Sequence, residues 1–308
     1  MAQALDLKGI VPATVLPLTA DCQVDEGELR KYIRWIAGQG IVAVAVNVDT
    51  GEGLHLWHDE KLRVLRIYKE ELAGRNIPIV AGLGASFTAQ AVKYGNDYRD
   101  AGANCLLVFP ITAYLGQPLP PEIPHHYHKA IADEVGLPMI LFTLQPALGG
   151  TNFADETLAR LAEIPQVVAI KEALFDAKRF REIATVIRAA SRPITILTGN
   201  DNFIWESYLL GAEGALLGAC ATCTRTHVMV YEAAMRGDWV TARELGDRIQ
   251  QVVNAIFAPP VRDYRARSKE VLVMQGIIQH AYMRPPLVAV GEADRLALKR
   301  ALAAAGEL

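Results

Sequence analysis

The stretch IPIVAGLGASFTAQAVKYGNDYRDAGANCLLVF, residues 77–109, contains the unit that repeats along the chain. Its two ends, residues 77–83 and 103–109, are short apolar runs, and the segment between them follows Ser86 and ends at Gly102. Apolar runs of this length are typical of strands buried in a parallel sheet. Ser86 offers an oxygen to a helix N-terminus, and Gly102 suits a left-handed C-terminal cap. The stretch therefore predicts a strand, a covering helix and a second parallel strand.

The same alternation continues along nearly all of the 308 residues. Eight apolar runs at a spacing of about 30 residues are predicted to be strands, with amphipathic helices such as residues 26–37 and 59–72 between them. The predicted strands are residues 10–16, 41–48, 77–83, 103–109, 139–144, 167–172, 194–198 and 215–219. Eight such units favour a closed α/β fold, the (β/α)8 or TIM barrel, over an open doubly wound sheet.

The chain continues beyond the eighth unit with three further helical patterns, in residues 238–257, 268–282 and 292–305. No linker-like stretch separates these patterns from the preceding units. We therefore expect a barrel in residues 1–235 and a C-terminal helical extension, residues 236–308, that packs on the barrel.

The composition of the chain argues against several classes of protein. Hydrophobic residues make up 51% and charged residues 21%, which suits a large buried core, and the formal net charge of -3 provides no basic excess for nucleic acid. The apolar runs are far shorter than the roughly 20 residues of a membrane-spanning helix. Four cysteines do not make a disulfide framework in so long a chain. We expect a cytoplasmic protein that binds a small molecule, with neither nucleic acid nor membrane as a partner.

The loop VDTGE, residues 48–52, is the richest of the polar segments that follow the predicted strands. Barrel enzymes build their sites at the carboxyl ends of the strands, so such loops are candidates. Thr50 offers a hydroxyl, Gly51 allows backbone amides to approach a ligand, and Asp49 and Glu52 offer carboxylates. Amides and a hydroxyl at a strand end suit a bound carboxylate. An ordinary turn between strand and helix is the alternative.

Lys171, in VVAIKEA, ends an apolar run that is predicted to be buried. Burial disfavours the ammonium and lowers the pKa of the amine, which makes a lysine nucleophilic near neutral pH. Lys171 could therefore form a Schiff base with a carbonyl compound. Alternatively, Lys171 ends the strand and pairs with Glu172.

Seven motifs in this order resemble the family of dihydrodipicolinate synthase and N-acetylneuraminate lyase, over nearly the whole chain. They are VPATVLPL at 11–18, VDTGE at 48–52, VFP at 108–110, LPMILF at 137–142, AIKEA at 169–173, TGND at 198–201 and MRPPL at 283–287. The resemblance implies a class I lyase, an aldolase or dehydratase, that acts on pyruvate or another 2-oxo acid. It also implies a homotetramer, built as a dimer of dimers, that needs no cofactor.

The resemblance implies specific roles for several residues. Lys171 matches the lysine that condenses with the ketone of the 2-oxo acid. Thr50 matches the threonine whose hydroxyl and neighbouring amides hold the carboxylate of the 2-oxo acid, and Gly51 completes that turn. We expect the rest of the substrate pocket to include Phe142, Thr143 and Leu216.

The sequence also departs from the family pattern. Phe142 stands where the family usually has a tyrosine that moves protons to and from the Schiff base, and a phenyl ring cannot transfer a proton. Asp49 replaces the threonine that normally precedes Thr50, and Ile111 or Thr112 replaces a second tyrosine. We hypothesise that Asp49 carries out the proton transfer.

Two alternatives to that hypothesis stay open. Asp49 could merely cap the following turn. Tyr114, just after the fourth predicted strand, could carry the proton instead, or it could pack at a subunit interface.

The segment QPALGG, residues 145–150, bears on the substrate because it lacks the arginine that many synthases carry there. A role in lysine biosynthesis is therefore not expected. The apolar side chains of Phe142, Leu144 and Leu148 favour a less anionic substrate, such as a sugar acid or one that yields an aromatic aldehyde. The main alternative is a non-catalytic family member that only binds 2-oxo acids, as a sensor or an inactive subunit.

Three groups of potential metal ligands occur in the sequence. They are the pair Cys220 and Cys223, the pair His55 and His58, and the cluster His125, His126 and His128. The cysteines lack a second CxxC pair and are expected to serve as packing, and the histidine cluster is expected on a solvated helix face. We expect no metal site, although a barrel enzyme of another kind that uses a metal or phosphate is a third possible class.

Overall fold

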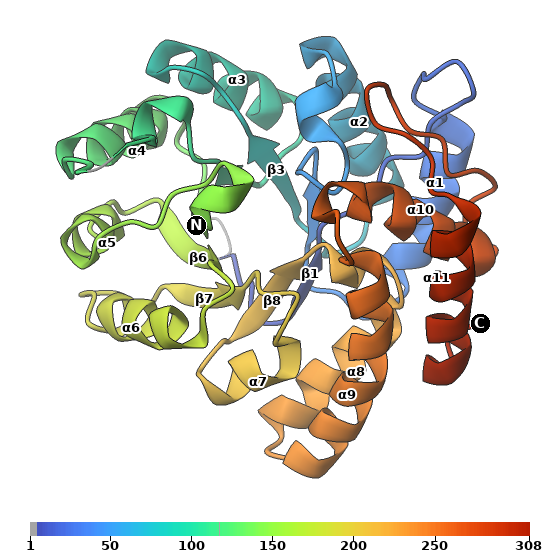
Figure 1. The fold of residues 1–308 in the computed structure, drawn as a ribbon. Helices are drawn as coiled ribbons and strands as arrows, with labels where there is room; N and C mark the ends of the chain where they lie inside the picture. Colours follow the sequence, from blue (N-terminus) through green and yellow to red (C-terminus); the bar gives the residue numbers. More distant parts are fainter. Residues whose placement is uncertain (1–4, 117) are drawn as a thin grey trace.

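The computed structural model describes residues 5–116 and 118–308, and its centre is a ring of parallel strands surrounded by helices (Figure 1). The strands are β1 (Ile10–Pro12), β2 (Val44–Val46), β3 (Ile79–Leu83), β4 (Cys105–Val108), β5 (Met139–Leu144), β6 (Val167–Ala173), β7 (Thr195–Thr198) and β8 (Gly214–Leu217). Hydrogen bonding joins them in the order β1-β8-β7-β6-β5-β4-β3-β2. A parallel bridge between Ala13 and Ala45 brings the ends of this order together. The predicted (β/α)8 barrel is confirmed.

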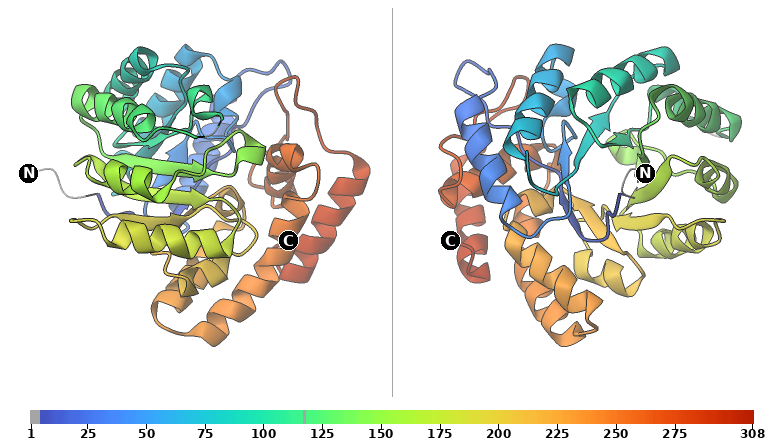
Figure 2. Two further views of the ribbon diagram at one scale, coloured as in Figure 1. Left: turned by 60° about the vertical axis from the view of Figure 1, so that its left-hand side comes forward. Right: turned by 180° about the vertical axis from the view of Figure 1, so that it is seen from behind.

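Eight helices lie around the ring, one after each strand (Figures 1 and 2). They are α1 (Glu26–Ala37), α2 (His58–Glu71), α3 (Thr88–Ala101), α4 (Glu122–Val135), α5 (Asp155–Ala162), α6 (Ala177–Arg188), α7 (Ile204–Leu209) and α8 (Thr224–Met235). Within the described residues, none of the helices is both long and apolar enough to cross a bilayer.

All eight strands occur where the sequence predicts them, but several ends differ. The second strand begins at Val44, later than predicted, and it ends at Val46 because Asn47 adopts a left-handed conformation with φ of 57°. Gly102 is the left-handed cap of α3, as predicted, with φ of 114°. Ser86 is not the N-cap of that helix: α3 begins at Thr88, after Phe87.

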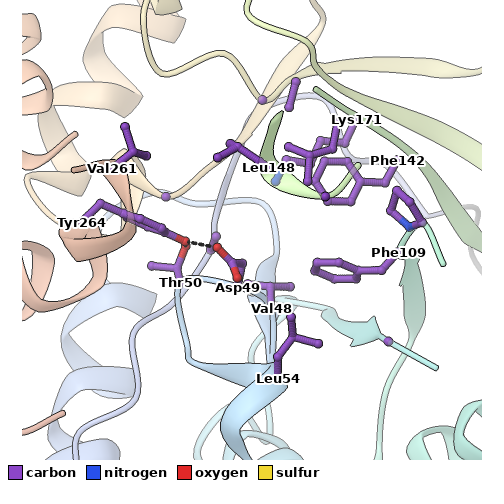
Figure 3. A pocket seen from close by; sticks show the side chains of 18 of the residues that line it. Val48, Asp49, Thr50, Leu54, Phe109, Phe142, Leu148, Lys171, Val261 and Tyr264 are labelled. Carbon is purple, nitrogen blue, oxygen red and sulfur yellow. Dashed lines mark hydrogen bonds between the residues drawn. The ribbon is translucent and has the colours of Figure 1, made fainter. Parts of the chain in front are cut away.

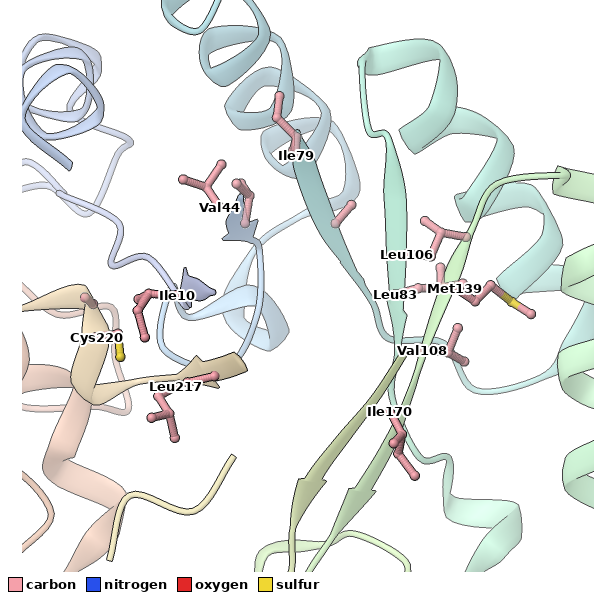
Figure 4. Close-up of a cluster of buried hydrophobic side chains, with 14 of the residues drawn as sticks. Ile10, Val44, Ile79, Leu83, Leu106, Val108, Met139, Ile170, Leu217 and Cys220 are labelled. Atoms are coloured by element: carbon pink, nitrogen blue, oxygen red, sulfur yellow. The ribbon is translucent and has the colours of Figure 1, made fainter. Parts of the chain in front are cut away.

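Two apolar layers form the core, because neighbouring residues of a strand point to opposite faces of the sheet. One layer fills the inside of the ring and includes Val11, Val80 and Leu216. The other lies between the strands and the surrounding helices and includes Leu217 and the side chains in Figure 4. Both layers consist of buried apolar side chains. Polar side chains of the strands and loops are therefore found mainly at the strand ends.

The chain after α8 forms α9 (Trp239–Ile256), α10 (Tyr264–Met274) and α11 (Glu292–Ala305), which lie together at one side of the barrel (Figure 1). They enclose a third apolar cluster that includes Ile249, Val271 and Leu298. The prediction of one helix over residues 268–282 is wrong at both ends, since α10 begins at Tyr264 and the chain turns at Gly276, where φ is 70°. The division at residues 235 and 236 stays a prediction, and residues 1–4 of the predicted barrel segment lie outside the described residues.

A buried ion pair joins α10 to the loop after β2. Lys269 Nζ contacts Glu52 Oε1, and both side chains are 0% exposed. Lys269 also donates a hydrogen bond to Tyr282 O at 2.7 Å, and Glu52 accepts one from the backbone amide of Arg284 at 3.2 Å. Arg265 lies one helical turn before Lys269, so the same face of α10 presents both cations to this loop.

We predict that Lys269→Met lowers the free energy of unfolding by about 3–5 kcal/mol, because it leaves the carboxylate of Glu52 buried without its counter-charge. Combining Lys269→Met with Glu52→Gln removes both charges and should restore part of the loss. Urea titration followed by circular dichroism measures the effect.

A matched control is Lys129→Met on α4, which breaks a pair with Asp133 whose side chains are 46% and 52% exposed. Such a pair contributes less than about 1 kcal/mol. If Lys269→Met destabilises the protein no more than Lys129→Met does, the Lys269–Glu52 pair is not important for stability.

Candidate functional site

A cavity of about 490 Å³ lies at the carboxyl ends of the strands, where the fold gathers polar side chains (Figure 3). Its wall includes Asp49 and Thr50 after β2, Phe142 on β5, Lys171 on β6, Asp201 after β7 and Gly218 after β8. The C-terminal extension supplies a further part of the wall, formed by Phe257, Val261, Arg262, Tyr264 and Arg265. The cavity is therefore shared between the barrel and the extension.

Lys171 projects from β6 into the cavity beside Phe142, its partner in the register of β5 and β6 (Figure 3). Its Nζ lies 4.4 Å from the centroid of the Phe142 ring. Burial lowers the pKa of Lys171 to about 8, and the negative charges of Asp201 and Asp49 oppose this shift. Within the described residues, no side chain forms an ion pair or hydrogen bond with this amine. A large share of it is therefore neutral near pH 8.

Glu172 does not pair with Lys171, which corrects one interpretation of the sequence. It is the next residue of the strand, so its side chain points to the opposite face of the sheet. Its carboxylate accepts hydrogen bonds from the amide of Leu174 at 3.0 Å and from Asn200 Nδ2 at 2.5 Å. Burial raises the pKa of Glu172 to about 7, and the hydrogen bond from Asn200 opposes the shift.

The geometry of the VDTGE loop depends on glycine at position 51. A Cβ atom on Gly51 would lie 2.8 Å from Thr14 O, so a larger residue does not fit without moving the backbone. The backbone amides of Thr50 and Gly51 have no acceptor within the described part of the chain. The amide of Glu52, in contrast, donates to Asp49 O at 3.0 Å. Two neighbouring amides are thus free to donate to a ligand.

Asp49 is held by residues of α10. Its Oδ1 forms an ion pair with Arg265 Nη2, and its Oδ2 accepts a hydrogen bond from the Tyr264 hydroxyl at 2.8 Å. Arg265 Nε also donates to Asp49 O at 2.8 Å. The alternative in which the Asp49 side chain caps its own turn is wrong in this structure. The carboxylate instead links the β2 loop to the extension.

Asp201 is a buried carboxylate near Lys171. Its Oδ1 accepts a hydrogen bond from the amide of Ala219 at 3.1 Å. Burial raises the pKa of Asp201 to about 6, and this hydrogen bond and the charge of Lys171 oppose the shift. Above that pH, Asp201 is the stronger of the two negative charges that act on Lys171.

Of the residues predicted to form the site, Lys171, Asp49, Thr50 and Phe142 line the cavity. Gly51, Thr143 and Leu216 do not belong to its wall: Leu216 packs inside the ring, and Thr143 lies between two lining residues of β5. Their substrate-binding roles stay predictions.

Tyr114, the alternative proton carrier, does not reach the cavity. It is 1% exposed and packs edge-on against Tyr127 and Phe153, with ring centroids at 6.0 and 5.7 Å. The structure therefore removes Tyr114 from the candidates.

None of the lining residues of the extension, including Tyr264 and Arg265, was identified from the sequence. These two stand 215 and 216 positions from Asp49, so no local spacing connects them to it. The segment PPVRDYR, residues 259–265, also lies before the helix predicted for residues 268–282, and its two prolines are typical of a loop.

The potential metal ligands do not converge in the described part of the chain. No group of three or more His, Cys, Asp or Glu residues there has the arrangement of a metal site. Cys220 and Cys223 are buried, in agreement with a packing role. His128 is also buried, with Nδ1 at 2.7 Å from Pro124 O, so the expectation of a solvated face is wrong for this residue.

Comparison with known proteins agrees with the fold and covers almost the whole chain. The family model described as "Dihydrodipicolinate synthetase family" matches residues 6–305. The 4-hydroxy-tetrahydrodipicolinate synthase of Thioalkalivibrio sulfidiphilus is 33% identical over 301 residues, which are 97% of each chain. The enzyme of the same name from Acidobacterium capsulatum is 32% identical over 306 residues, 99% of this chain and 96% of the relative.

Solved structures show the same similarity. Dihydrodipicolinate synthase from Acinetobacter baumannii, solved in complex with pyruvate, is 30% identical with a TM-score of 0.86, and the match covers 98% of this chain and 100% of that one. A monomeric dihydrodipicolinate synthase variant superposes with a TM-score of 0.91 over 100% of both chains, but its 24% identity supports the fold alone. The chain therefore belongs to the dihydrodipicolinate synthetase family, a family of class I aldolases and lyases.

Proposed function

We propose that this protein is a lyase, an aldolase or dehydratase, that forms a Schiff base between Lys171 and pyruvate or another 2-oxo acid. The observation that carries the proposal is the amine of Lys171, which faces the cavity, has a pKa lowered by burial to about 8 and has no polar partner in the described chain. Pyruvate is bound to the Acinetobacter baumannii relative, which supports the choice of ligand.

The reaction begins when the neutral amine of Lys171 attacks the ketone carbon. A proton moves from nitrogen to the new alkoxide to give the carbinolamine. Its hydroxyl takes a further proton from solvent and leaves as water, so that an iminium ion remains on Nζ. The Thr50 hydroxyl and the free amides of Thr50 and Gly51 hold the carboxylate of the 2-oxo acid. The iminium withdraws electrons from the neighbouring carbon, so a carbon–carbon bond there can form or break, or a hydroxyl can leave. This chemistry needs no cofactor.

We further propose that the substrate has an apolar far end and that the enzyme does not serve lysine biosynthesis. The cavity wall is rich in apolar side chains, which include Leu54, Phe109, Ile111, Phe142, Leu144, Leu148, Phe175, Phe257 and Val261. Two arginines reach the wall, but Arg265 pairs with Asp49 and Arg262 with Asp263, so a carboxylate already faces each cation. These features favour an aromatic aldehyde over an anionic one.

We also propose a cytoplasmic homotetramer, on the basis of the family. Exposed apolar side chains on the loops after β2, β3 and β4 support subunit contacts there: Leu54, Trp57, Phe87 and Leu115 are 58–77% exposed. A monomer by light scattering would contradict the tetramer.

Reduction with borohydride in the presence of pyruvate should attach a pyruvate-derived adduct to Lys171. Intact mass and peptide mapping identify the modified residue. Lys171→Ala should give no adduct, and Lys178→Ala, which removes an exposed lysine of α6, should react like the wild type. Failure of the wild type with pyruvate and with a panel of longer 2-oxo acids would overturn the proposed function.

The rate of adduct formation should rise with pH through about 8 and then level off, because the neutral amine is the nucleophile and burial lowers the pKa of Lys171 to that value. An ordinary lysine, with a pKa near 10.4, would continue to gain rate up to about that pH. Asp201→Asn and Asp49→Asn should each shift the midpoint to lower pH, the first by more, since both charges favour the ammonium. A midpoint near pH 10 would contradict this account.

With pyruvate as the donor, benzaldehyde should be consumed with at least about tenfold higher kcat/KM than succinic semialdehyde, because the cavity wall is apolar and its cations are paired. Leu148 is 46% exposed and lies in the segment that lacks the arginine of many synthases. Leu148→Arg should therefore reduce or reverse this preference. Chromatography of the products measures both rates. Adduct formation without turnover of any aldehyde or dehydration of any 2-oxo acid would favour the non-catalytic alternative.

A further inference from the structure

Tyr264 places a phenol in the cavity that contains Lys171. Its ring stacks on Phe257, with centroids 4.8 Å apart and an angle of 15° between the planes. Its hydroxyl lies 2.8 Å from Asp49 Oδ2 and 3.3 Å from Thr50 Oγ1 (Figure 3). Tyr264 is 7% exposed, so the surrounding side chains hold its ring and hydroxyl in this position.

The position of this phenol matters because Phe142 cannot transfer protons. Phe142 lies beside Lys171, with its ring under the amine, and contributes no polar atom. Among the described residues of the cavity wall, Tyr264 is the one phenol, and it is joined by hydrogen bonding to the threonine proposed to hold the substrate. The extension therefore supplies a phenol to the cavity wall that also contains Lys171.

We propose that Tyr264 is the proton carrier of this site and that Asp49 is its partner, in a relay of Thr50, Tyr264 and Asp49. The inference rests on the proposed function and names the group that moves the proton. It revises the hypothesis drawn from the sequence, in which Asp49 acts directly on the substrate.

Both carboxylate oxygens of Asp49 already have donors from α10. Arg265 holds one carboxylate oxygen, and Tyr264 occupies the other. Asp49 Oδ2 is the acceptor of the Tyr264 O–H, so the phenol proton has a carboxylate oxygen to move to. Burial raises the pKa of Tyr264 well above its usual value, so the resting group is a neutral hydroxyl that can donate.

The proton balance of the relay can be written for carbon–carbon bond formation. The C3–H bond of the pyruvate iminium breaks, its electrons form the C2=C3 bond, and the C=N electrons return to nitrogen. The proton goes to the Tyr264 oxygen, directly or through Thr50, while the phenol proton moves to Asp49. When C3 then attacks the aldehyde, the new alkoxide takes a proton from Tyr264, and Asp49 returns its proton to the phenol. No other reactant is needed.

The test uses pyruvate alone, so it does not require the natural substrate. In deuterated buffer the wild-type enzyme should exchange the methyl hydrogens of pyruvate for deuterium, which proton NMR follows. Tyr264→Phe retains the ring that stacks on Phe257 and should slow the exchange by about a hundredfold or more. The same variant should still form the borohydride-trapped adduct to the wild-type extent, which establishes that its pocket is folded.

A matched control is Tyr114→Phe, which removes a buried phenol outside the cavity and should leave the exchange rate within about twofold of the wild type. Asp49→Asn should slow the exchange about as much as Tyr264→Phe. The double variant should be no slower than the slower single variant, because residues that act as one unit give non-additive losses.

The outcomes separate the two proposals. Absence of an adduct in the wild type overturns the proposed function. Normal adduct formation with unchanged exchange in Tyr264→Phe overturns the relay and leaves the Schiff base in place. Losses that multiply in the double variant, or an equal loss in Tyr114→Phe, also overturn the relay.

Discussion

The buried ion pair between Lys269 and Glu52 is the contact on which the geometry of the site depends. Leaving one of these buried charges without its partner is costly, so the pair favours the position of α10 that brings Lys269 to Glu52. Arg265, one turn earlier on the helix, then meets Asp49, and Tyr264 comes with it. The loop after β2 thereby acquires a second support besides the barrel, and a pocket wall is built from two distant parts of the chain.

The sequence was sufficient to predict the barrel and the place of Lys171 in the cavity wall. Strands of a parallel barrel are buried on both faces, which makes them visible as apolar runs, and a lysine at the end of such a run stands out. Lys171 stands out through this local signal, whereas the role expected for Thr50 came from the resemblance to the family. The family pattern added the expectation of a missing tyrosine at Phe142, and the structure places that phenyl ring directly beside the amine.

The remainder of the site could not be predicted because it depends on tertiary contacts. Tyr264 and Asp49 meet across 215 positions, and neither has a sequence pattern that indicates the other. Leu216 illustrates a different limit: it belongs to the same inner layer as Phe142, which lines the cavity, but Leu216 is absent from the cavity wall. The sequence does not show where along each strand the packed interior ends and the cavity begins.

The division of the cavity wall between barrel and extension has a consequence for the newly made protein. A ribosome delivers all eight strands before it delivers residue 264, so a nascent barrel has the Lys171 amine before it has the Tyr264 phenol. The site becomes complete only when the last part of the chain docks. Under the proposed relay, variation in the extension would alter how protons move in the site while the barrel and its lysine stay the same.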